Sequence, residues 1–299
     1  MSGLADRAVA AGYRAGWAGV RLLPERTAAR LFRVGADLAV RREGKGVARL
    51  RANYARVTGR PAAELDDLVR AGVRSYARYW CEVFRLPSAD QAKVAREFHV
   101  GDEERLSAAR DAGRGVILVL AHLGNWDVAA VWLLSRGVRF TTVAERLKPE
   151  SLFDAFLEFR ESLGMEVIPL TGGQQPPFAV LADRLRAGGV LCLLADRDLT
   201  AGGVEVGFFG ATATMPAGPA ALALETGAVL MPTIVTNAEG PELWAGCVTF
   251  GAEVPHTDVA TMTQQVAAAF EVGIGARPQD WHMLQRLWRD DLTSRPAAL

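Results

Sequence analysis

The segment "VILVLAHLGNWD", residues 116–127, decides the fold. Its first part is an uninterrupted apolar run of strand length, which is typical of a strand buried on both faces of a sheet. The run ends abruptly in His122, and Asp127 follows five positions later. Ligands of open α/β sheets bind at the carboxyl ends of the strands. The segment therefore predicts a polar site at the end of a buried strand.

The chain beyond residue 98 repeats this pattern. Apolar runs of strand length cover residues 115–121, 139–145, 165–170, 189–195, 228–235 and 243–250. Stretches with helical periodicity lie between or after them, at residues 126–136, 150–163, 176–187, 216–226 and 258–274. This alternation predicts an α/β fold with a mostly parallel central sheet flanked by helices.

The first third of the chain is predicted to be helical. Helices are expected over residues 4–23, 25–41, 46–57 and 61–86, with Pro61 opening the last one and Pro87 closing it. No linker rich in Pro, Gly or Ser interrupts the chain. We therefore expect a single domain over residues 1–299, with a basic helical part (1–97) that faces a membrane and an α/β catalytic core (98–299).

Composition excludes several classes of protein. The chain has 299 residues, of which 50% are hydrophobic and 23% charged, so it can bury a globular core. Its three cysteines lack C-x-x-C spacing, which argues against a disulfide framework or a zinc site and suits a reducing cytosol. Asp6 and Arg7 interrupt the start where a secretion signal would be apolar. No apolar stretch reaches the roughly 18 residues of a membrane span, so we expect neither export nor a transmembrane helix.

Positive charge is concentrated at the front of the chain. Residues 1–60 hold 13 Arg and Lys against 4 acidic residues, although the whole chain is neutral. Arg7, Arg14 and Arg21 recur every seventh residue beside an apolar stripe that contains Trp17. These four residues are predicted to contact an anionic membrane surface. The alternative is that the stripe packs on the sheet and the arginines are only solvated; a nucleic-acid partner is disfavoured because no recognised binding module is present.

The spacing of His122 and Asp127 suggests acid–base chemistry. On one continuous helix the two side chains would point about 140° apart. Gly124 permits a tight turn and Asn125 is a good N-cap, so a helix can begin at Trp126 with Asp127 in its first turn. We expect Asp127 to fold back onto His122 and orient it as a general base. The alternative is a buried structural histidine beside an ordinary first-turn acid.

A family resemblance favours the catalytic interpretation. "AHLGNWDVAAVWL" (121–133) resembles the H-x4-D segment of the bacterial lysophospholipid and lipid A biosynthesis acyltransferases, and three further blocks follow in order. They are "AERLKPESLFDAFLEFRESLGMEVIPL" (144–170), the segment from "LLADRDL" (193–199) to residue 235, and "RPQDWHMLQRLW" (277–288). The resemblance covers about residues 95–290. Within the family, an arginine-rich, lysine-poor chain is most similar to the branch of actinobacterial phosphatidylinositol mannoside acyltransferases.

The resemblance implies a fold like that of glycerol-3-phosphate acyltransferase and a specific reaction. A long-chain fatty acyl group, with palmitoyl as the expected one, would move from acyl-coenzyme A to a mannose hydroxyl of a phosphatidylinositol mannoside. The enzyme would work at the cytoplasmic face of the plasma membrane as a peripheral protein. Acyl-coenzyme A would be a co-substrate, and no metal or other cofactor is implied, because a thiolate is a good leaving group.

The resemblance also implies further site residues. Asp196 would assist His122, although many relatives carry a glutamate there, which is one methylene longer. Five charged residues at or near strand ends would bind sugar hydroxyls and phosphate: Glu145, Arg146, Arg160, Arg197 and Asp198. Their alternative role is that of solvated loop charges or mutual ion pairs. His99, His256 and His282 are expected to be structural or surface residues.

The absence of two sequence motifs argues against two other functions. No G-x-S-x-G turn indicates a serine hydrolase, and no Walker A motif indicates nucleotide binding. A related acyltransferase that uses another glycolipid or a lysophospholipid as acceptor stays open. So does a non-catalytic lipid-binding relative, which would bind lipid without depending on His122.

Overall fold

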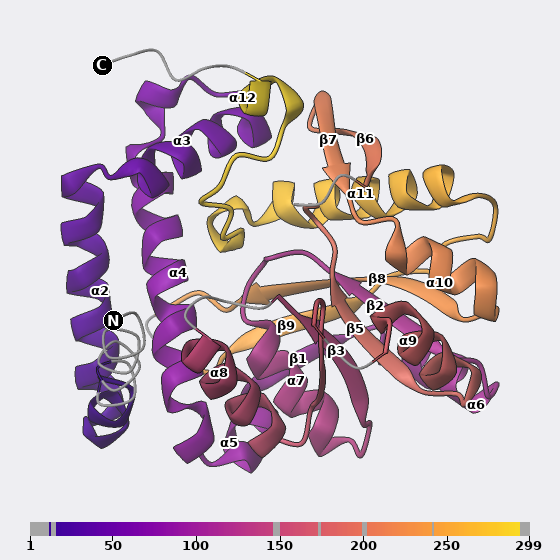
Figure 1. Ribbon diagram of the computed structural model, residues 1–299. Coiled ribbons are helices and arrows are strands. Elements are labelled where there is room, and N and C mark those ends of the chain that lie inside the picture. The colour runs from indigo at the N-terminus through magenta and orange to yellow at the C-terminus, as the bar shows by residue number, and fades with distance from the viewer. Residues whose placement is uncertain are drawn as a thin grey trace, which may run out of the picture.

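A seven-stranded sheet forms the centre of the molecule (Figure 1). The computed structural model describes residues 12, 16–145, 150–172, 175–198, 202–240 and 242–293. The strand order is β1-β9-β8-β2-β5-β3-β4, and every neighbouring pair is parallel except β8 and β9. The predicted α/β class with a mostly parallel sheet is confirmed.

The bounds of the strands and helices are as follows. The strands are β1 Phe98–Gly101, β2 Val116–Leu120, β3 Phe140–Ala144, β4 Glu166–Pro169, β5 Val190–Leu194, β8 Val229–Asn237 and β9 Gly246–Phe250, with β6 Val204–Phe208 and β7 Ala211–Met215 forming a separate hairpin. The helices are α2 Glu25–Arg42, α3 Lys45–Thr58, α4 Asp66–Arg85, α5 Gln91–Glu97, α6 Glu103–Asp111, α7 Trp126–Ser135, α8 Glu150–Ser162, α9 Pro177–Arg186, α10 Gly218–Thr226, α11 Val259–Ala276 and α12 Arg289–Thr293.

Strand β2 lies in the middle of the sheet and fixes the position of the site. All five of its side chains are buried, as its unbroken apolar run predicts. It pairs in parallel with β5 on one side and β8 on the other, so Leu120 lies opposite Leu194 and Thr233. The loops that follow β2 and β5 therefore leave the sheet at the same level.

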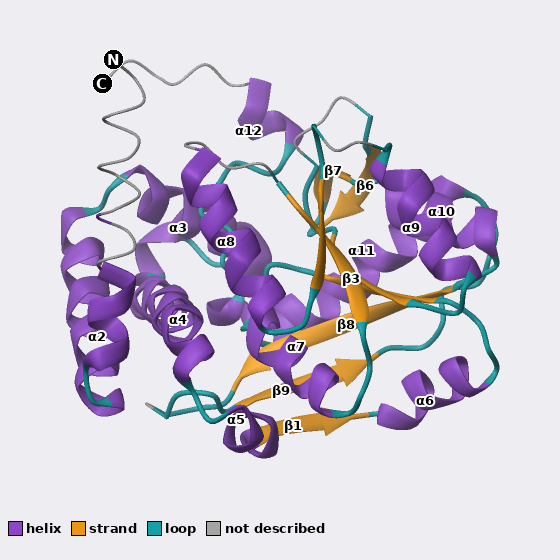
Figure 2. Cartoon of the chain, turned by 60° about the horizontal axis from the view of Figure 1, so that its bottom comes forward, coloured by secondary structure: helices purple, strands orange, loops and turns teal. Residues whose placement is uncertain are grey.

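Helices cover both faces of the sheet, as the view of Figure 2 shows. On one face, α9, α10, α11 and the β6–β7 hairpin enclose one hydrophobic core. On the other face, α5, α6, α7 and α8 enclose a second core. Two covered faces explain why the central strands are apolar on both sides rather than alternating.

Helices α3 and α4 connect the front of the chain to its end. Asn53 of α3 donates hydrogen bonds to the backbone carbonyls of Met283 and Gln285. The hydroxyl of Tyr54 donates to the backbone carbonyl of Trp281. Asn53 and Tyr54 are both buried. The segment after α11 is therefore held against the sheet by helices from the other end of the sequence.

Some elements differ from the sequence prediction. Helix α4 begins at Asp66 instead of residue 61, because Pro61 opens a short 3-10 turn at Ala62–Glu64. Strand β1, helices α5 and α6, and the β6–β7 hairpin were not predicted. Each of these elements is nine residues long or shorter. So short a segment shows little hydrophobic periodicity, and its position depends on the elements it packs against.

The predicted membrane contact of Trp17 is wrong. Its ring is 7% exposed and contacts Phe84, Phe156 and Phe159, so it belongs to the core. Arg21 is exposed, and its Nε donates to the carbonyl of Phe84. Because three aromatic side chains surround the ring, little of it is left to contact a lipid interface. Arg7 and Arg14 lie outside the described residues.

No helix within the described ranges is long and apolar enough to span a bilayer.

Candidate active site

His122 pairs with Asp196 at the carboxyl end of the sheet. Each residue follows its strand by two positions, and the parallel register of β2 and β5 brings the two side by side. Nδ1 of His122 lies 2.5 Å from Oδ1 of Asp196, and the backbone N–H of His122 donates to Oδ2 at 3.0 Å. One carboxylate thus fixes both the main chain and the ring of His122.

The prediction that Asp127 orients His122 is wrong. Asp127 lies in the first turn of α7, as expected, but its carboxylate accepts hydrogen bonds from Arg160 at 3.0 and 3.3 Å and from the Tyr79 hydroxyl at 3.0 Å. The helix that begins at Trp126 directs Asp127 toward α4 and α8. Asp196 therefore occupies the position beside His122 that the spacing suggested for Asp127.

The Asp127–Arg160 pair is buried. Asp127 is 2% exposed, and the Arg160 side chain is 19% exposed. Burial lowers the pKa of Arg160, but the charges and hydrogen bonds of Asp127 and Tyr79 together outweigh burial, and the pKa is raised. Burial also raises the pKa of Tyr79. Its hydroxyl therefore stays protonated and donates a hydrogen bond to Asp127. Arg160 is accordingly placed as the partner of Asp127 and not as a solvent-facing phosphate ligand.

The start of α7 is fixed by a second buried carboxylate. The side-chain oxygen of Asn125 accepts from the N–H groups of Asp127 and Val128, which makes it the N-cap that the sequence predicts. Its Nδ2 donates to Glu82 of α4 at 2.7 Å. Glu82 is 1% exposed and also accepts from Arg78. The turn after His122 is thus anchored to α4.

Asp196 stays ionised although it is 0% exposed. Burial raises its pKa, but the charge and the hydrogen bonds of His122, together with the indole N–H of Trp281, lower it further than burial raises it. The net effect is a pKa below the usual range of an aspartate. A permanent negative charge therefore faces Nδ1 of His122.

This geometry defines what His122 can do. A carboxylate accepts hydrogen bonds, so Nδ1 carries the proton and Nε2 keeps its lone pair. Nε2 has no partner among the described residues, and the side chain is 22% exposed. The ring can therefore accept a proton from a substrate, and Asp196 stabilises the cation that forms. In the described part of the chain, no group of three or more His, Cys, Asp or Glu residues could hold a metal ion.

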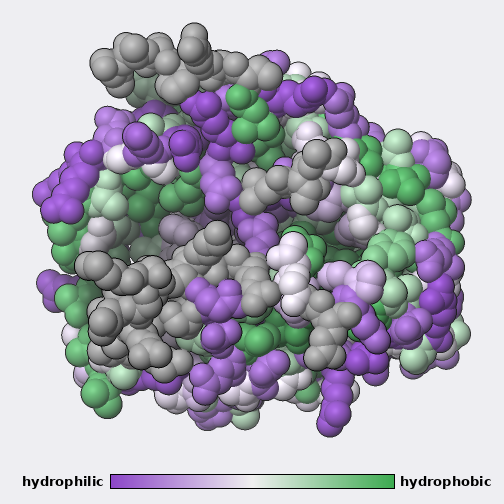
Figure 3. Space-filling view, viewed as in Figure 1, coloured by the Kyte–Doolittle hydropathy of each residue, from purple (hydrophilic) through white to green (hydrophobic). Residues whose placement is uncertain are grey.

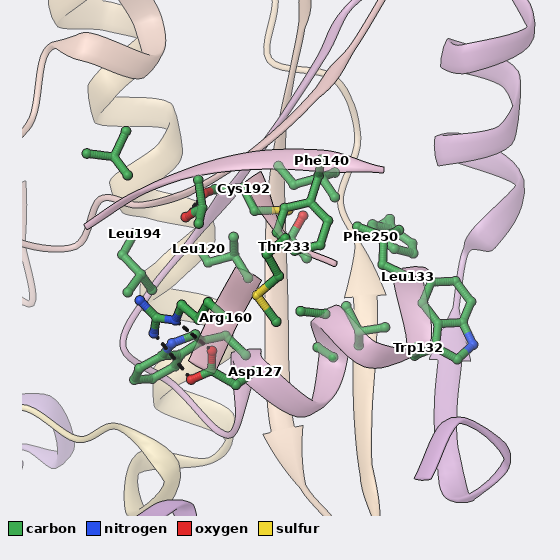
Figure 4. Close-up of a pocket in the computed structure, with 18 residues that line it drawn as sticks. Leu120, Asp127, Trp132, Leu133, Phe140, Arg160, Cys192, Leu194, Thr233 and Phe250 are labelled. Atoms are coloured by element: carbon green, nitrogen blue, oxygen red, sulfur yellow. Dashed lines mark hydrogen bonds and ion pairs between the residues drawn. The ribbon is translucent and has the colours of Figure 1, made fainter. Parts of the chain in front are cut away.

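An apolar cavity lies between the sheet and α7 (Figure 4), and neither His122 nor Asp196 lines it. It has a volume of about 70 Å³. The Asp127–Arg160 pair lies at one end, and Trp132 and Leu133 lie at the other. The ring of Trp126 lines the cavity and is 5.5 Å from the ring of His122, measured between centroids. The walls are otherwise mostly aliphatic and aromatic side chains.

Three other predicted site residues follow strand ends: Glu145 comes after β3, and Arg197 and Asp198 come after β5. Arg197 lies 3.7 Å from Glu145 and donates to the side-chain oxygen of Gln285. The backbone N–H of Asp198 donates to the carbonyl of Thr214. Arg146 lies outside the described residues. The structure thus brings Glu145 and Arg197 together, whereas Asp196 pairs with His122.

The sequence did not predict that Tyr79, Glu82 and Trp281 belong to the site. They lie on α4 and after α11, far from His122 in the sequence, and no local spacing connects them to it. The only signal was the tryptophan-rich block at 277–288, which stood out by resemblance. Buried polar groups next to a reactive histidine need partners, and these side chains are the partners.

His282 is structural, as predicted. Its Nε2 lies 3.1 Å from Oγ of Ser75, and that hydroxyl also donates to Asp280. Its Nδ1 is buried without a partner in the described structure. Burial, and then the charge of His122, lower the pKa of His282 to about 3, so this ring stays neutral.

A second cavity lies between α2, α4 and the segment after β8. Four arginines line it, and the donors of three of them, Arg74, Arg78 and Arg277, are already used. Arg78 binds Glu82 and two backbone carbonyls, and Arg277 binds Glu239, Asp280 and a carbonyl. Arg74 forms a bidentate pair with Asp37. The charges neutralise one another, which makes this wall a structural network.

Comparison with known proteins agrees with this geometry. The family model described as "Bacterial lipid A biosynthesis acyltransferase" matches residues 6–290, so the likeness includes the N-terminal helices. The chain is 51% identical over 288 residues to a phosphatidylinositol mannoside acyltransferase of Mycolicibacterium smegmatis, covering 96% of this chain and 93% of that protein. It is also 51% identical over 291 residues to the protein of that name from Mycobacterium tuberculosis, covering 96% and 91%.

Proposed function

The chain belongs to the bacterial lipid A biosynthesis acyltransferase family, and from that premise we propose that it acylates a phosphatidylinositol mannoside. The acyl donor is acyl-coenzyme A with a long chain such as palmitoyl, and the acceptor is a mannose hydroxyl. The names of its mycobacterial relatives support the acceptor. The observation that carries the chemistry is the pairing of His122 with buried Asp196, which leaves Nε2 of the ring available to a substrate.

In the proposed reaction His122 acts as a general base. Nε2 removes the proton from the mannose hydroxyl while that oxygen attacks the thioester carbonyl carbon. The tetrahedral intermediate collapses with cleavage of the C–S bond, and the thiolate receives the proton back from the imidazolium. Asp196 holds the ring in the reactive tautomer and stabilises the transient cation. This scheme requires no metal or further cofactor, because the thiolate leaves readily.

The apolar cavity is proposed to receive part of the acyl chain. Its walls are mostly hydrocarbon and aromatic, so burial of each methylene contributes about 0.8 kcal/mol. Because the cavity reaches Trp126 beside His122, a chain seated in it would place its thioester near the base.

The charged residues after β3 and β5 are proposed to bind the polar parts of the substrates. Glu145 is half exposed and can accept hydrogen bonds from sugar hydroxyls, and Arg197 can donate to a phosphate or a sugar oxygen. Both follow carboxyl ends of strands, as His122 and Asp196 do. Arg146 and Asp198 are proposed to make further contacts with the substrates.

The deciding experiment is an acyl-transfer assay with purified protein. Radiolabelled palmitoyl-coenzyme A is incubated with phosphatidylinositol mono- and dimannoside, lysophosphatidic acid and a lipid A precursor, and products are identified by mass spectrometry. We expect a palmitoylated mannoside, and its loss in His122→Ala. His99→Ala is the control, because His99 is exposed on β1.

Three results would reject the proposal. Transfer to another acceptor alone would assign the chain a different acyltransferase reaction. Equal turnover by the parent and His122→Ala would remove His122 from the mechanism. Binding of mannoside without turnover by the parent would instead indicate a non-catalytic lipid-binding protein.

We also propose peripheral attachment to the cytoplasmic face of the membrane through α2. Leu31, Val34 and Leu38 are 55%, 49% and 46% exposed, and their spacing places them on one face of the helix. We call these three residues the α2 stripe. Exposed arginines on the same helix are Arg26, Arg30, Arg33, Arg41 and Arg42.

This composition suits a lipid interface. Figure 3 shows hydrophobic and hydrophilic residues side by side along the edge formed by α2. Apolar side chains can enter the interface while arginines meet lipid phosphates, at about 1 kcal/mol per charge near an anionic surface. The α2 stripe thus takes the role that the sequence suggested for Trp17.

A further inference from the structure

We propose that Trp281 is a positioning residue for this site, whose indole N–H fixes Asp196 in the orientation that faces His122. The inference rests on the proposed function for its kinetic consequences, and on geometry alone for its effect on the titration of His122.

Trp281 supplies one of the three hydrogen bonds that Asp196 accepts. Its Nε1 lies 2.9 Å from Oδ2 of Asp196. The other two come from the backbone N–H and the ring of His122. Without the indole donor, the carboxylate would be held only by the residue that it is meant to orient. Trp281 is the independent anchor of the pair.

The main chain of Trp281 is itself fixed on several sides. Its carbonyl accepts from the hydroxyl of Tyr54, and it forms a bridge with Leu123, next to His122. The following N–H, that of His282, donates to the carbonyl of His122 at 2.8 Å. The ring of Trp281 is 0% exposed. An indole held in this way cannot follow Asp196 if the carboxylate turns away.

The physical effect of the indole N–H is twofold. It limits rotation of the Asp196 carboxylate, and it lowers the basicity of that group, because a hydrogen bond to the charged form stabilises it. Removing the donor makes the carboxylate a stronger base, which stabilises the imidazolium of His122. The ring then releases its proton at a higher pH.

The chain provides a matched control in Trp288. Trp288 is also 0% exposed, and its ring centroid is 6.2 Å from that of Trp281. Its Nε1 donates at 2.9 Å to the carbonyl of Phe208 instead of to a carboxylate. The two tryptophans therefore each lose one buried hydrogen bond when the N–H is removed, but only one of those bonds reaches Asp196.

The test replaces each tryptophan in turn by β-(3-benzothienyl)alanine, in which sulfur replaces the indole N–H and the ring shape is kept. At position 281 we expect kcat to fall about 10-fold or more with a nearly unchanged KM, by analogy with the loss of partners that orient metal ligands. We expect the acid limb of the pH profile of kcat/KM to move up by about 0.5 to 1 pH unit. At position 288 we expect neither change.

An NMR titration of the His122 ring keeps the test independent of turnover. Its midpoint should rise in the 281 variant and not in the 288 variant. The charge of His122 also acts on the His282 ring, but that ring stays neutral. His282 is the same residue in the 281 and 288 variants. The phenylalanine pair, Trp281→Phe and Trp288→Phe, repeats the comparison without an unnatural amino acid.

The outcomes separate the two proposals. An unchanged midpoint and an unchanged acid limb in the 281 variant, or equal shifts in both variants, would overturn the role of Trp281. An inactive parent protein whose His122 midpoint still rises on loss of the 281 N–H would reject the acyltransferase proposal and retain the positioning role.

Discussion

Asp196 contacts His122 twice, through the backbone N–H at 3.0 Å and through Nδ1 at 2.5 Å, although 74 positions separate the two residues. The parallel register of β2 and β5 creates this contact. The orientation and the tautomer of the proposed base therefore depend on one buried carboxylate.

Asp196→Asn is expected to lower kcat by about 10³-fold, because an amide can no longer hold Nδ1–H and stabilise the imidazolium. Asp196→Glu keeps the charge and should recover part of the activity. Steady-state kinetics with palmitoyl-coenzyme A and dimannoside measures both variants. An Asn variant as active as the parent would show that the pair is not part of the mechanism.

Asp127→Asn is expected to cost about 3 kcal/mol of unfolding free energy, because Arg160 is left as a largely buried, unpaired charge. The double variant Asp127→Asn with Arg160→Met removes that charge and should be more stable than Asp127→Asn alone. Urea unfolding of the parent, Asp127→Asn, Arg160→Met and the double variant gives the coupling free energy between the two side chains. Strictly additive effects would mean that the two side chains do not stabilise each other.

His282 predicts a pH dependence of stability. Its pKa is about 3 when folded and near 6.5 when unfolded, so the unfolded chain takes up the proton first as pH falls. The stability from this neutral ring is complete above about pH 6.5 and is lost as pH decreases toward 3. The loss of unfolding free energy between pH 6.5 and pH 4.5 amounts to about 2 kcal/mol.

The measurement compares urea unfolding of the parent and His282→Gln at these two pH values. The glutamine variant should show a shallower loss of stability, since it lacks the group that gains the proton. His99→Gln, at an exposed position, is the control. Identical slopes for the parent and His282→Gln would contradict a neutral, buried ring.

Leu133→Trp is expected to shorten the acyl cavity. Leu133 is 4% exposed and lines the end far from Asp127 and Arg160. The larger ring should reduce kcat/KM for palmitoyl-coenzyme A about 10-fold relative to decanoyl-coenzyme A, as the loss of roughly two buried methylenes would. Because both donors are tested on the same variant, any loss of stability cancels in the ratio. An unchanged ratio would place the acyl chain elsewhere.

Replacing the α2 stripe by Leu31→Gln, Val34→Gln and Leu38→Gln is expected to weaken binding to vesicles rich in phosphatidylinositol about 10-fold or more, because the apolar contact with the interface is lost. Sedimentation with vesicles measures binding. Turnover of a short-chain, detergent-dispersed acceptor is the control and should be unaffected. Full vesicle binding by the triple variant would show that another surface carries the attachment.

Much of the fold could be predicted because its signals are local. The buried strand at 116–120, the turn at Gly124 and the N-cap at Asn125 each need only neighbouring residues, and each was found as predicted. The short β6–β7 hairpin was missed, because its pairing and its contact with α11 are tertiary.

The sequence by itself determined the chemical inventory of the protein: an α/β chain, a histidine at the mouth of its central strand, and acids within reach of it. Only the tertiary structure decided which acid serves the histidine. Asp127 is close in sequence but is turned by its helix toward Arg160, whereas Asp196 is distant in sequence but adjacent through strand register. Spacing along a chain limits local geometry, and the pairing of strands determines which ends meet.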